Sequence, residues 1–284
     1  MFYLFRELKL RPVLTGVLSL VPNLYDWWDS HRPMGNTSSA PYSRRIWRIH
    51  LENYRNVHNG KMPEAVAEFG PGATLGACIA ALCDGVNEAT GLDVCPYASD
   101  NTENSRILEE LLSQEEASRD TGFLQKAVSS VGSKQETVLK YVAPWNDLSI
   151  LPESSLDLIF SHSVMEHVDD PAEAYKACFH WLKPGGIISH KIDHSSHGVT
   201  KSWNGHYGIP KVLWKIIVGK RPYLLNRMTP LQHQTAIESA GFRILSIKSV
   251  KASESDNNYS QTLVRKNADC WIKTSTFICK KAES

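Results

Sequence analysis

Short runs of apolar residues alternate with amphipathic stretches from about residue 64 onward. The apolar runs that predict strands are 64–69, 86–94, 137–142, 156–161 and 186–192. The intervening stretches that predict helices are 74–83, 103–117, 123–131 and 171–182. An alternation of strands and helices of this kind predicts a parallel sheet with helices on both faces.

A different pattern follows the fifth predicted strand. Residues 193–229 are rich in His, Trp, Tyr, Lys and Pro and contain a short predicted helix at 209–218. A helix at 230–241 and strands at 242–250 and 270–281 follow. Because no helix separates the last two strands, they are predicted to be antiparallel neighbours or edge partners. The pattern therefore predicts an α/β fold with a mostly parallel sheet and an insert after its fifth strand.

Residues 1–60 show no strand alternation and predict a helical N-terminal extension. The opening stretch, "MFYLFRELKLRPVLTGVLSLVPNLYDWW", is interrupted by charges and by two prolines, so it predicts neither a signal peptide nor a transmembrane helix. Our main interpretation is an amphipathic helix packed on the domain. Peripheral contact of this segment with a membrane, at the inner membrane surface of the cell, is the alternative.

Composition narrows the class of protein. A formal net charge of +1, with scattered basic residues, gives no reason to expect a nucleic-acid partner. The six cysteines form no CxxC pair, and most lie in apolar stretches. They predict buried thiols in a reducing compartment, and hence a cytoplasmic protein.

The stretch "AEFGPGATLG", residues 67–76, places a glycine-rich turn between a strand and a helix. Gly70 and Gly72 would let a ligand approach the backbone, and Asp93 ends the next strand, where an acid can accept both hydroxyls of a ribose. A dinucleotide suits this turn poorly, because Pro71 removes an N–H group and Glu68 adds negative charge near a pyrophosphate. S-adenosylmethionine has an adenosine, a cationic sulfonium and no phosphate, and it is the predicted ligand.

Several segments resemble class I S-adenosylmethionine-dependent methyltransferases, namely "VAEFGPGATLG", "GLDV", "LDLIFSHSVMEHVDDPAEAYKACFHWLKPGG" and the paired terminal strands. The resemblance implies a Rossmann-like methyltransferase domain over residues 61–284, with seven strands and the last strand antiparallel. It implies the following cofactor contacts: Glu68, Gly70, Pro71, Gly72, Asp93 and Val94. Asp147 is the candidate for the adenine, and Arg45 is the candidate for the methionine carboxylate. A looser similarity is to a group associated with cell-surface polysaccharide biosynthesis.

Histidines gather where the fourth and fifth predicted strands end. "SHSVMEH" contains His162, and "HKIDHSSH" contains Asp193 and His194. Methyl transfer to a hydroxyl needs a base, and histidine titrates near neutrality. The candidates for that base are His194 first, then His162, and Asp193.

Glu166 and His167 permit two interpretations, a structural helix start or a metal site. A related group of quinone O-methyltransferases uses a similar Glu-Glu-His region for a divalent metal, but Ser163 replaces the first acid here. His and Asp side chains within 193–197 have the chemistry of metal ligands, yet no partner spacing requires a metal. The sequence assigns no metal ligand, and metal dependence stays open.

The predicted activity is S-adenosylmethionine-dependent O-methylation of a sugar hydroxyl in a glycan or glycolipid. The insert, with Trp203, Tyr207 and Trp214, is predicted to lie over the acceptor as a lid or to form a small auxiliary core. Three alternatives remain. They are methylation of a small phenol, quinone or natural product, a catalytically silent cofactor-binding partner protein, and an NAD-linked oxidoreductase, which Glu68 and Pro71 argue against.

Overall fold

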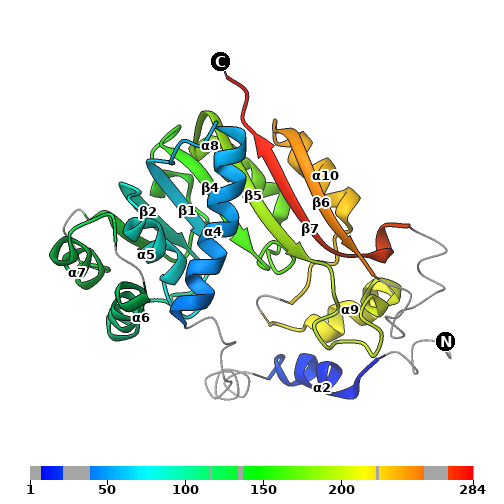
Figure 1. Ribbon diagram of the computed structural model, residues 1–284. Coiled ribbons are helices and arrows are strands. Elements are labelled where there is room, and N and C mark those ends of the chain that lie inside the picture. Colours follow the sequence, from blue (N-terminus) through cyan, green and yellow to red (C-terminus); the bar gives the residue numbers. More distant parts are fainter. Residues whose placement is uncertain are drawn as a thin grey trace.

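The computed structural model describes residues 8–21, 39–114, 117–133, 137–221, 224–252 and 268–283. One seven-stranded sheet runs through the described residues in the order β3-β2-β1-β4-β5-β7-β6 (Figure 1). The strands are β1 (Ala65–Phe69), β2 (Glu88–Leu92), β3 (Leu139–Val142), β4 (Leu156–His162), β5 (Leu182–Asp193), β6 (Arg243–Lys251) and β7 (Ile272–Lys280). β1 to β5 are parallel, and β7 runs antiparallel to both β5 and β6. The predicted fold class, including the antiparallel last strand, is confirmed.

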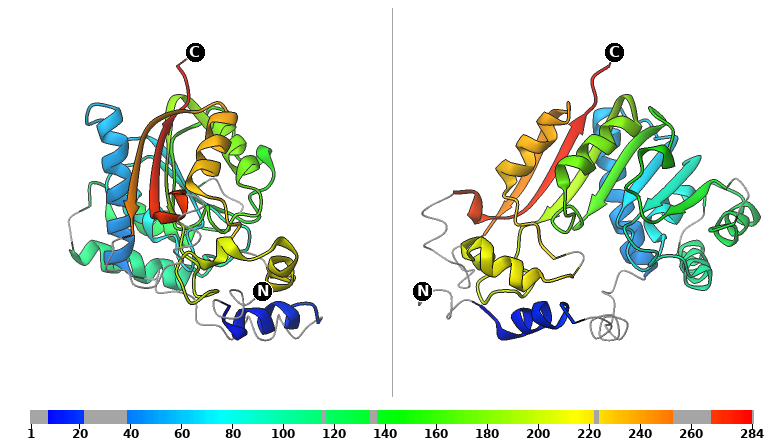
Figure 2. Two further views of the ribbon diagram at one scale, coloured as in Figure 1. Left: turned by 90° about the vertical axis from the view of Figure 1, so that its right-hand side faces the viewer. Right: turned by 180° about the vertical axis from the view of Figure 1, so that it is seen from behind.

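Helices cover both faces of the sheet, as Figure 2 shows from the side. The α-helices are α2 (Leu10–Leu18), α4 (Ala40–Val57), α5 (Gly76–Cys83), α6 (Asn101–Gln114), α7 (Thr121–Ser129), α8 (Pro171–Trp181), α9 (Lys211–Val218) and α10 (Pro230–Ser239). One buried core joins the sheet to α4, α5, α6 and α7, and a second joins the other face to α8 and α10. The central strands are mostly apolar because both of their faces are buried.

The boundaries of several strands differ from the sequence predictions, and β2 and β5 differ most clearly. β2 is shorter than the predicted run 86–94. β5 begins at Leu182, directly after α8, so that "KPGG" lies inside the strand rather than in a turn before it. The pairing of β4 with β5 shifts register between Leu156 and Leu158. The extra residues of β5 at this irregularity explain why the sequence pattern looks like a turn.

The insert after β5 has a small core of its own, formed by Val199, Ile209, Trp214, Ile217 and Leu225. The interpretation of Trp214 as part of an auxiliary core is therefore confirmed. α2 packs against α9 so closely that a Cβ on Gly16 would lie 2.3 Å from the carbonyl oxygen of Ile216. Both helices lie beside the edge of the sheet at which the parallel strands end (Figure 1).

The N-terminal extension is helical where it is described, in α2 and α4, whereas residues 1–7 and 22–38 lie outside the described ranges. Ser39 caps α4 by accepting a hydrogen bond from the Tyr42 amide, and α4 contributes buried side chains to the sheet core. Within the described ranges, no helix has the length and hydropathy needed to cross a membrane. The division at residue 60 stays a prediction.

Asp84, the residue that caps the C-terminus of α5, ties α4 to α5 and gives a test of this packing. It accepts hydrogen bonds from the Arg44 guanidinium at 2.9 Å and from the Trp47 indole at 2.8 Å. Asp84→Ala should lower the free energy of unfolding by about 2–3 kcal/mol, because the buried guanidinium and indole lose their carboxylate.

Urea denaturation followed by circular dichroism measures this effect. The matched control is Glu88→Ala, which removes a pair with Lys140 in which both side chains are substantially exposed. That change should cost less than about 1 kcal/mol. Equal losses in the two variants would contradict the importance of the Asp84 contacts.

Candidate active site at the carboxyl edge of the sheet

The glycine turn follows β1 and is shaped by backbone angles that favour glycine. Gly70 and Gly72 have φ values of 66° and 77°. The Gly70 amide donates a 2.8 Å hydrogen bond to the Leu92 carbonyl of β2. A Cβ on Gly70 would lie 2.6 Å from the side chain of Val164, in the loop after β4. The turn is therefore pressed between β2 and the β4 loop, and a side chain at Gly70 would disrupt it.

Asp93 lies directly after β2, beside the glycine turn. Its carboxylate accepts a 2.7 Å hydrogen bond from the Val94 amide, and the residue is 8% exposed. Burial raises the pKa of Asp93 to about 6, although the amides of Val94, Cys95 and Gly72 act in the opposite direction. A buried carboxylate at the end of the second strand fits a ribose. The two ribose hydroxyls would replace the hydrogen bonds to water that the carboxylate loses on burial.

Glu68 is a second buried carboxylate next to the turn. Its Oε2 accepts from the Cys78 thiol, a weak donor, at 3.6 Å. Burial raises the pKa of Glu68 to about 8. A cationic ligand near this carboxylate would recover part of the free energy that its burial costs. Glu68, the glycine turn and Asp93 together fit a ligand that has both an adenosine and a positive charge.

The other predicted cofactor contacts differ in their placement. Pro71 lies inside the turn, where it would be 3.3 Å from a Cβ added to Gly91. Val94 is partly exposed. Asp147 is exposed and accepts hydrogen bonds from the amide and hydroxyl of Ser149 at 2.9 and 2.8 Å, which caps the short helix η1 (Leu148–Ile150). This local role accounts for Asp147, and its contact with adenine stays a prediction.

Arg45 is exposed on α4, with its guanidinium 5.1 Å from the centre of the Tyr42 ring. Its charge also reaches His162, at the end of β4. Burial, then Lys191, then Arg45 lower the pKa of His162 to about 4. Lys191 Nζ lies 3.3 Å from His162 Nε2, and His162 Nδ1 is buried without a hydrogen-bond partner among the described residues. His162 is thus neutral at pH 7, and both assignments stay predictions.

His194, the first choice as base, is buried rather than open to an acceptor. It is 2% exposed, and its Nε2 lies 2.6 Å from the hydroxyl of Ser275 on β7. Burial lowers the pKa of His194 to about 4. The backbone explains the position, because the His194 amide donates to the Lys273 carbonyl and so continues the pairing with β7. This environment favours a structural role over proton transfer.

Asp193 has an imidazole partner, His197, from the loop at 193–197 in which the sequence predicted His and Asp side chains with the chemistry of metal ligands. His197 Nε2 lies 3.3 Å from an Asp193 carboxylate oxygen and 4.0 Å from Glu166 Oε1. Burial alone would raise the pKa of Asp193, but hydrogen bonds from His197 and Ser195 lower it to about 2. His197 is partly exposed, so the Asp193–His197 pair is open to a ligand in a way that His194 is not. The only sequence signal for His197 was its position in "HKIDHSSH".

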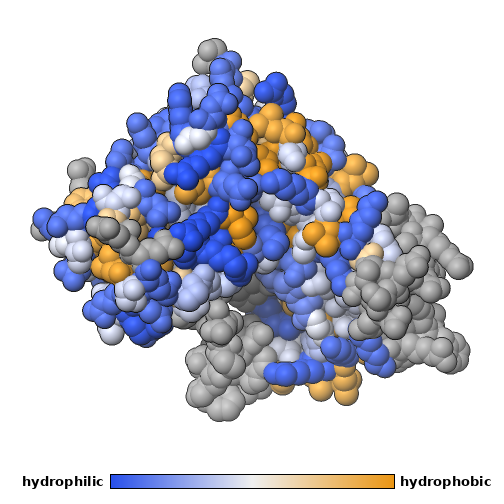
Figure 3. Space-filling model, in the orientation of Figure 1, coloured by the Kyte–Doolittle hydropathy of each residue, from blue (hydrophilic) through white to orange (hydrophobic). Residues whose placement is uncertain are grey.

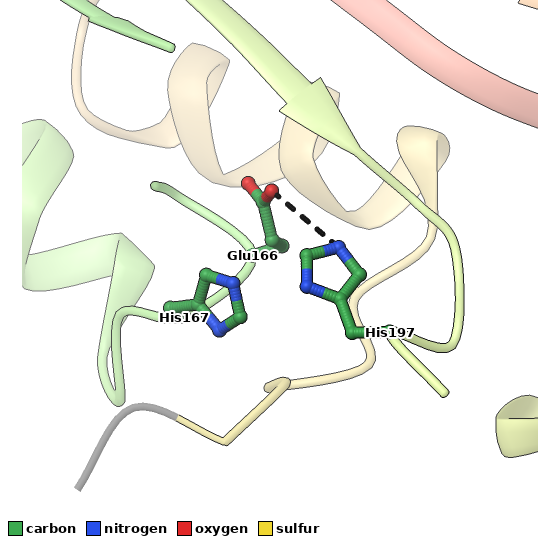
Figure 4. Close-up of side chains that lie close together, drawn as sticks. All are labelled: Glu166, His167 and His197. Atoms are coloured by element: carbon green, nitrogen blue, oxygen red, sulfur yellow. Dashed lines mark ion pairs between the residues drawn. The ribbon is translucent and has the colours of Figure 1, made fainter. Parts of the chain in front are cut away.

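The imidazole of this pair also belongs to a cluster of three side chains, Glu166, His167 and His197. One potential ligand atom from each lies within 4.8 Å of the other two, and Figure 4 shows the three side chains directed toward one another. Burial raises the pKa of Glu166 to about 8. The edge of the sheet thus carries a glycine turn with acids on one side and a cluster of carboxylates and imidazoles on the other.

Comparison with known proteins agrees with this geometry. Residues 67–189 match the family model described as "Methyltransferase domain", from β1 into β5. Residues 67–189 are a methyltransferase domain. The protein is an S-adenosylmethionine-dependent methyltransferase with the class I fold, and its glycine turn, Glu68 and Asp93 lie inside the matched region.

Solved structures also resemble the methyltransferase. A putative sarcosine dimethylglycine methyltransferase from Galdieria sulphuraria has a TM-score of 0.51 at 15% identity, over 84% of this chain and 86% of its own. A methyltransferase from Mesorhizobium loti has a TM-score of 0.46 at 15% identity, over 87% and 100% of the two chains. No curated protein matches the sequence of the methyltransferase.

Glu68 gives a prediction for pH dependence. Its folded pKa of about 8 lies above the unfolded value near 4.5, so the folded protein holds a proton that the unfolded chain has lost between these values. The stability that this proton contributes is fully present below about pH 4.5 and is lost as pH rises to about 8. The loss inside this window approaches about 1.4 kcal/mol per pH unit.

Urea denaturation of the ligand-free methyltransferase at pH 5.5 and pH 7.5 measures this dependence. Glu68→Gln should lose less stability between the two pH values than the wild type, because it has no proton to lose. A variant with the wild-type slope would show that Glu68 ionises normally in the folded state.

Proposed function

We propose that the protein methylates a sugar hydroxyl in a glycan or glycolipid during polysaccharide biosynthesis, at the cytoplasmic face of a membrane. The observation that carries O-methylation is the Asp193–His197 pair. Its imidazole is partly exposed, and its carboxylate lies 3.3 Å away. Asp193 is the last residue of β5 and His197 lies in the loop after it, at the edge of the sheet that carries the cofactor turn. An alcohol needs such a proton acceptor, because its own pKa is far above neutrality.

Two groups of residues at the carboxyl edge of the sheet take part in the proposed reaction, one beside the acceptor and one beside the cofactor. When bound, S-adenosylmethionine supplies an electrophilic methyl carbon on a sulfonium. The acceptor oxygen forms a bond to this carbon as the carbon–sulfur bond breaks, which leaves S-adenosylhomocysteine. The hydroxyl proton goes to the Asp193–His197 pair, in which the carboxylate stabilises positive charge on the imidazole. Asp93 and Glu68 hold the cofactor from the other side.

The surface of α2 supports a lipid-linked acceptor. Leu10, Leu14, Val17 and Leu18 recur at helical spacing and are all substantially exposed, whereas Thr15 and Gly16 face α9 and are buried. On a surface helix of a globular protein, the apolar residues ordinarily face the protein core. Figure 3 shows hydrophobic and hydrophilic residues together at the lower edge of the molecule, where α2 lies.

Charge on the same side favours an anionic surface. Lys9 and Arg11 on the α2 side and Lys211 and Lys215 on α9 are exposed, and neither helix contains an acidic residue. α9 also exposes Val212 and Ile216. Exposed leucines flanked by lysines match the chemistry of peripheral binding to anionic lipid. The backbone joins this surface to the site, because the Lys9 amide donates to the Val199 carbonyl two residues after His197.

Methyl transfer with labelled S-adenosylmethionine, screened against glycans, glycolipids and small phenols, tests the activity. Asp193→Asn and His197→Gln should each lower turnover by roughly a hundred to ten thousand fold and leave cofactor affinity nearly unchanged. His194→Gln is the matched control, because its ring is buried against Ser275. Turnover that falls only in the His194→Gln control would instead support His194 as the base. Methyl labelling of phenols alone, with none of glycans or glycolipids, would exclude a sugar hydroxyl as the acceptor.

The membrane contact has its own prediction. The double variant Leu14→Asp and Leu18→Asp should lose at least about tenfold in binding to vesicles that contain anionic lipid, since it removes exposed apolar area and adds negative charge. Co-sedimentation measures the bound fraction. Leu231→Asp, an exposed leucine on α10, is the control and should bind like the wild type. Equal binding by both variants would rule out α2 as the contact.

A further inference from the structure

The cluster beside Asp193 combines residues from two loops. Glu166 and His167 follow β4, and His197 follows β5. Their potential ligand atoms lie within 4.8 Å of one another, a separation from which small side-chain rotations can bring them to a common centre (Figure 4). Imidazole nitrogen and carboxylate oxygen are the ligands with which proteins bind zinc, iron and manganese.

Glu166 supplies the observation that points to a ligand. Its side chain is 4% exposed, and neither carboxylate oxygen makes a hydrogen bond of normal geometry with another described residue, although the backbone amides of Glu166 and Asp193 are close enough to lower its pKa against the effect of burial. A buried carboxylate without partners costs free energy in either protonation state. Oε1 is directed to the side of the His197 ring, at 4.0 Å from Nε2, so the space between them is where a cation would satisfy it (Figure 4).

The loop that carries Glu166 and His167 is held in place from the insert. The side-chain amide of Asn226 donates to the Met165 and Val168 carbonyls at 2.7 and 3.0 Å. The Asn226 backbone amide donates to the Glu166 carbonyl at 2.8 Å. A metal site needs ligands whose positions are fixed by such neighbours. Asp193 adds a second negative charge beside the same nitrogen of His197.

We propose that Glu166, His167 and His197 bind one divalent transition-metal ion. The ligand set is two imidazoles and a carboxylate, which leaves coordination positions open to an oxygen ligand from outside the protein. Ser163 lies in the loop after β4 but takes no part, because His197 completes the set from the neighbouring strand.

The role of the ion rests on the proposed function. An acceptor hydroxyl in an open position would be held by the ion, which would lower its pKa. With the ion bound, His197 would be a ligand rather than the proton acceptor, and the Asp193 carboxylate alone would take the hydroxyl proton. Metal binding itself needs neither the acceptor nor S-adenosylmethionine, so the two proposals can fail separately.

Titration of the full chain with Co²⁺ and with Zn²⁺, after treatment with a chelator and dialysis, tests the site. The wild type should bind one ion per chain, seen in the visible absorption of Co²⁺ and in competition for Zn²⁺ with a chromogenic chelator. Glu166→Gln and His197→Ala should each weaken binding by at least about tenfold. His180→Ala, a histidine on α8 outside the cluster, is the control and should bind like the wild type.

Circular dichroism and cofactor binding verify that each variant is folded, and the partly exposed His197 gives a variant that does not disturb the core. No stoichiometric ion in the folded wild type, or equal affinity in His197→Ala and the control, would overturn the site. Metal binding without methylation of any glycan or glycolipid would instead leave the site standing and overturn the proposed function.

Discussion

The close approach of Gly70 to Val164 fixes the relation between the two halves of the site. With no side chain at Gly70, the turn after β1 can lie against the loop after β4; a Cβ there would be 2.6 Å from Val164. That loop continues into Glu166 and His167. The cofactor turn and the carboxylate–imidazole cluster are therefore parts of one packed surface, and a change in either loop must be accommodated by the other.

Buried acids are the second constraint on this surface. Glu68 and Glu166 each have a pKa raised to about 8 by burial, and that of Asp93 is raised to about 6. A fold selected for stability alone would avoid carboxylates that burial makes this costly to ionise. Their placement at the carboxyl ends of β1, β2 and β4 is the pattern expected where stability has been given up for ligand binding.

The architecture was predictable from the sequence because apolar runs and helical periodicity report burial directly. The glycine turn and Asp93 were predictable for a related reason, since each adjoins a strand whose end fixes its position. The cluster was predictable only in part, because the sequence offered Glu166, His167 and the loop at 193–197 as possible metal ligands but not which histidine of that loop would join them. His194 and His197 look equivalent in "HKIDHSSH", and only the pairing with β7, continued by the His194 amide, buries the first and leaves the second partly exposed. α2 was predicted as an amphipathic helix, but which of its faces lies on the protein depends on α9, far along the chain.

The attachment of α2 has a consequence for how surface and chemistry are coupled. Leu8 pairs with Thr200 and the Lys9 amide with the Val199 carbonyl, so the start of this helix shares a backbone segment with His197. A force on α2 is thereby transmitted to the histidine without any intervening side chain. By thermodynamic reciprocity, whatever an interface does to ligand affinity at His197, a ligand there must do to adsorption at the interface, by the same factor. If α2 binds a membrane as proposed, occupancy of the site by a ligand would therefore change how long the protein stays bound to that membrane.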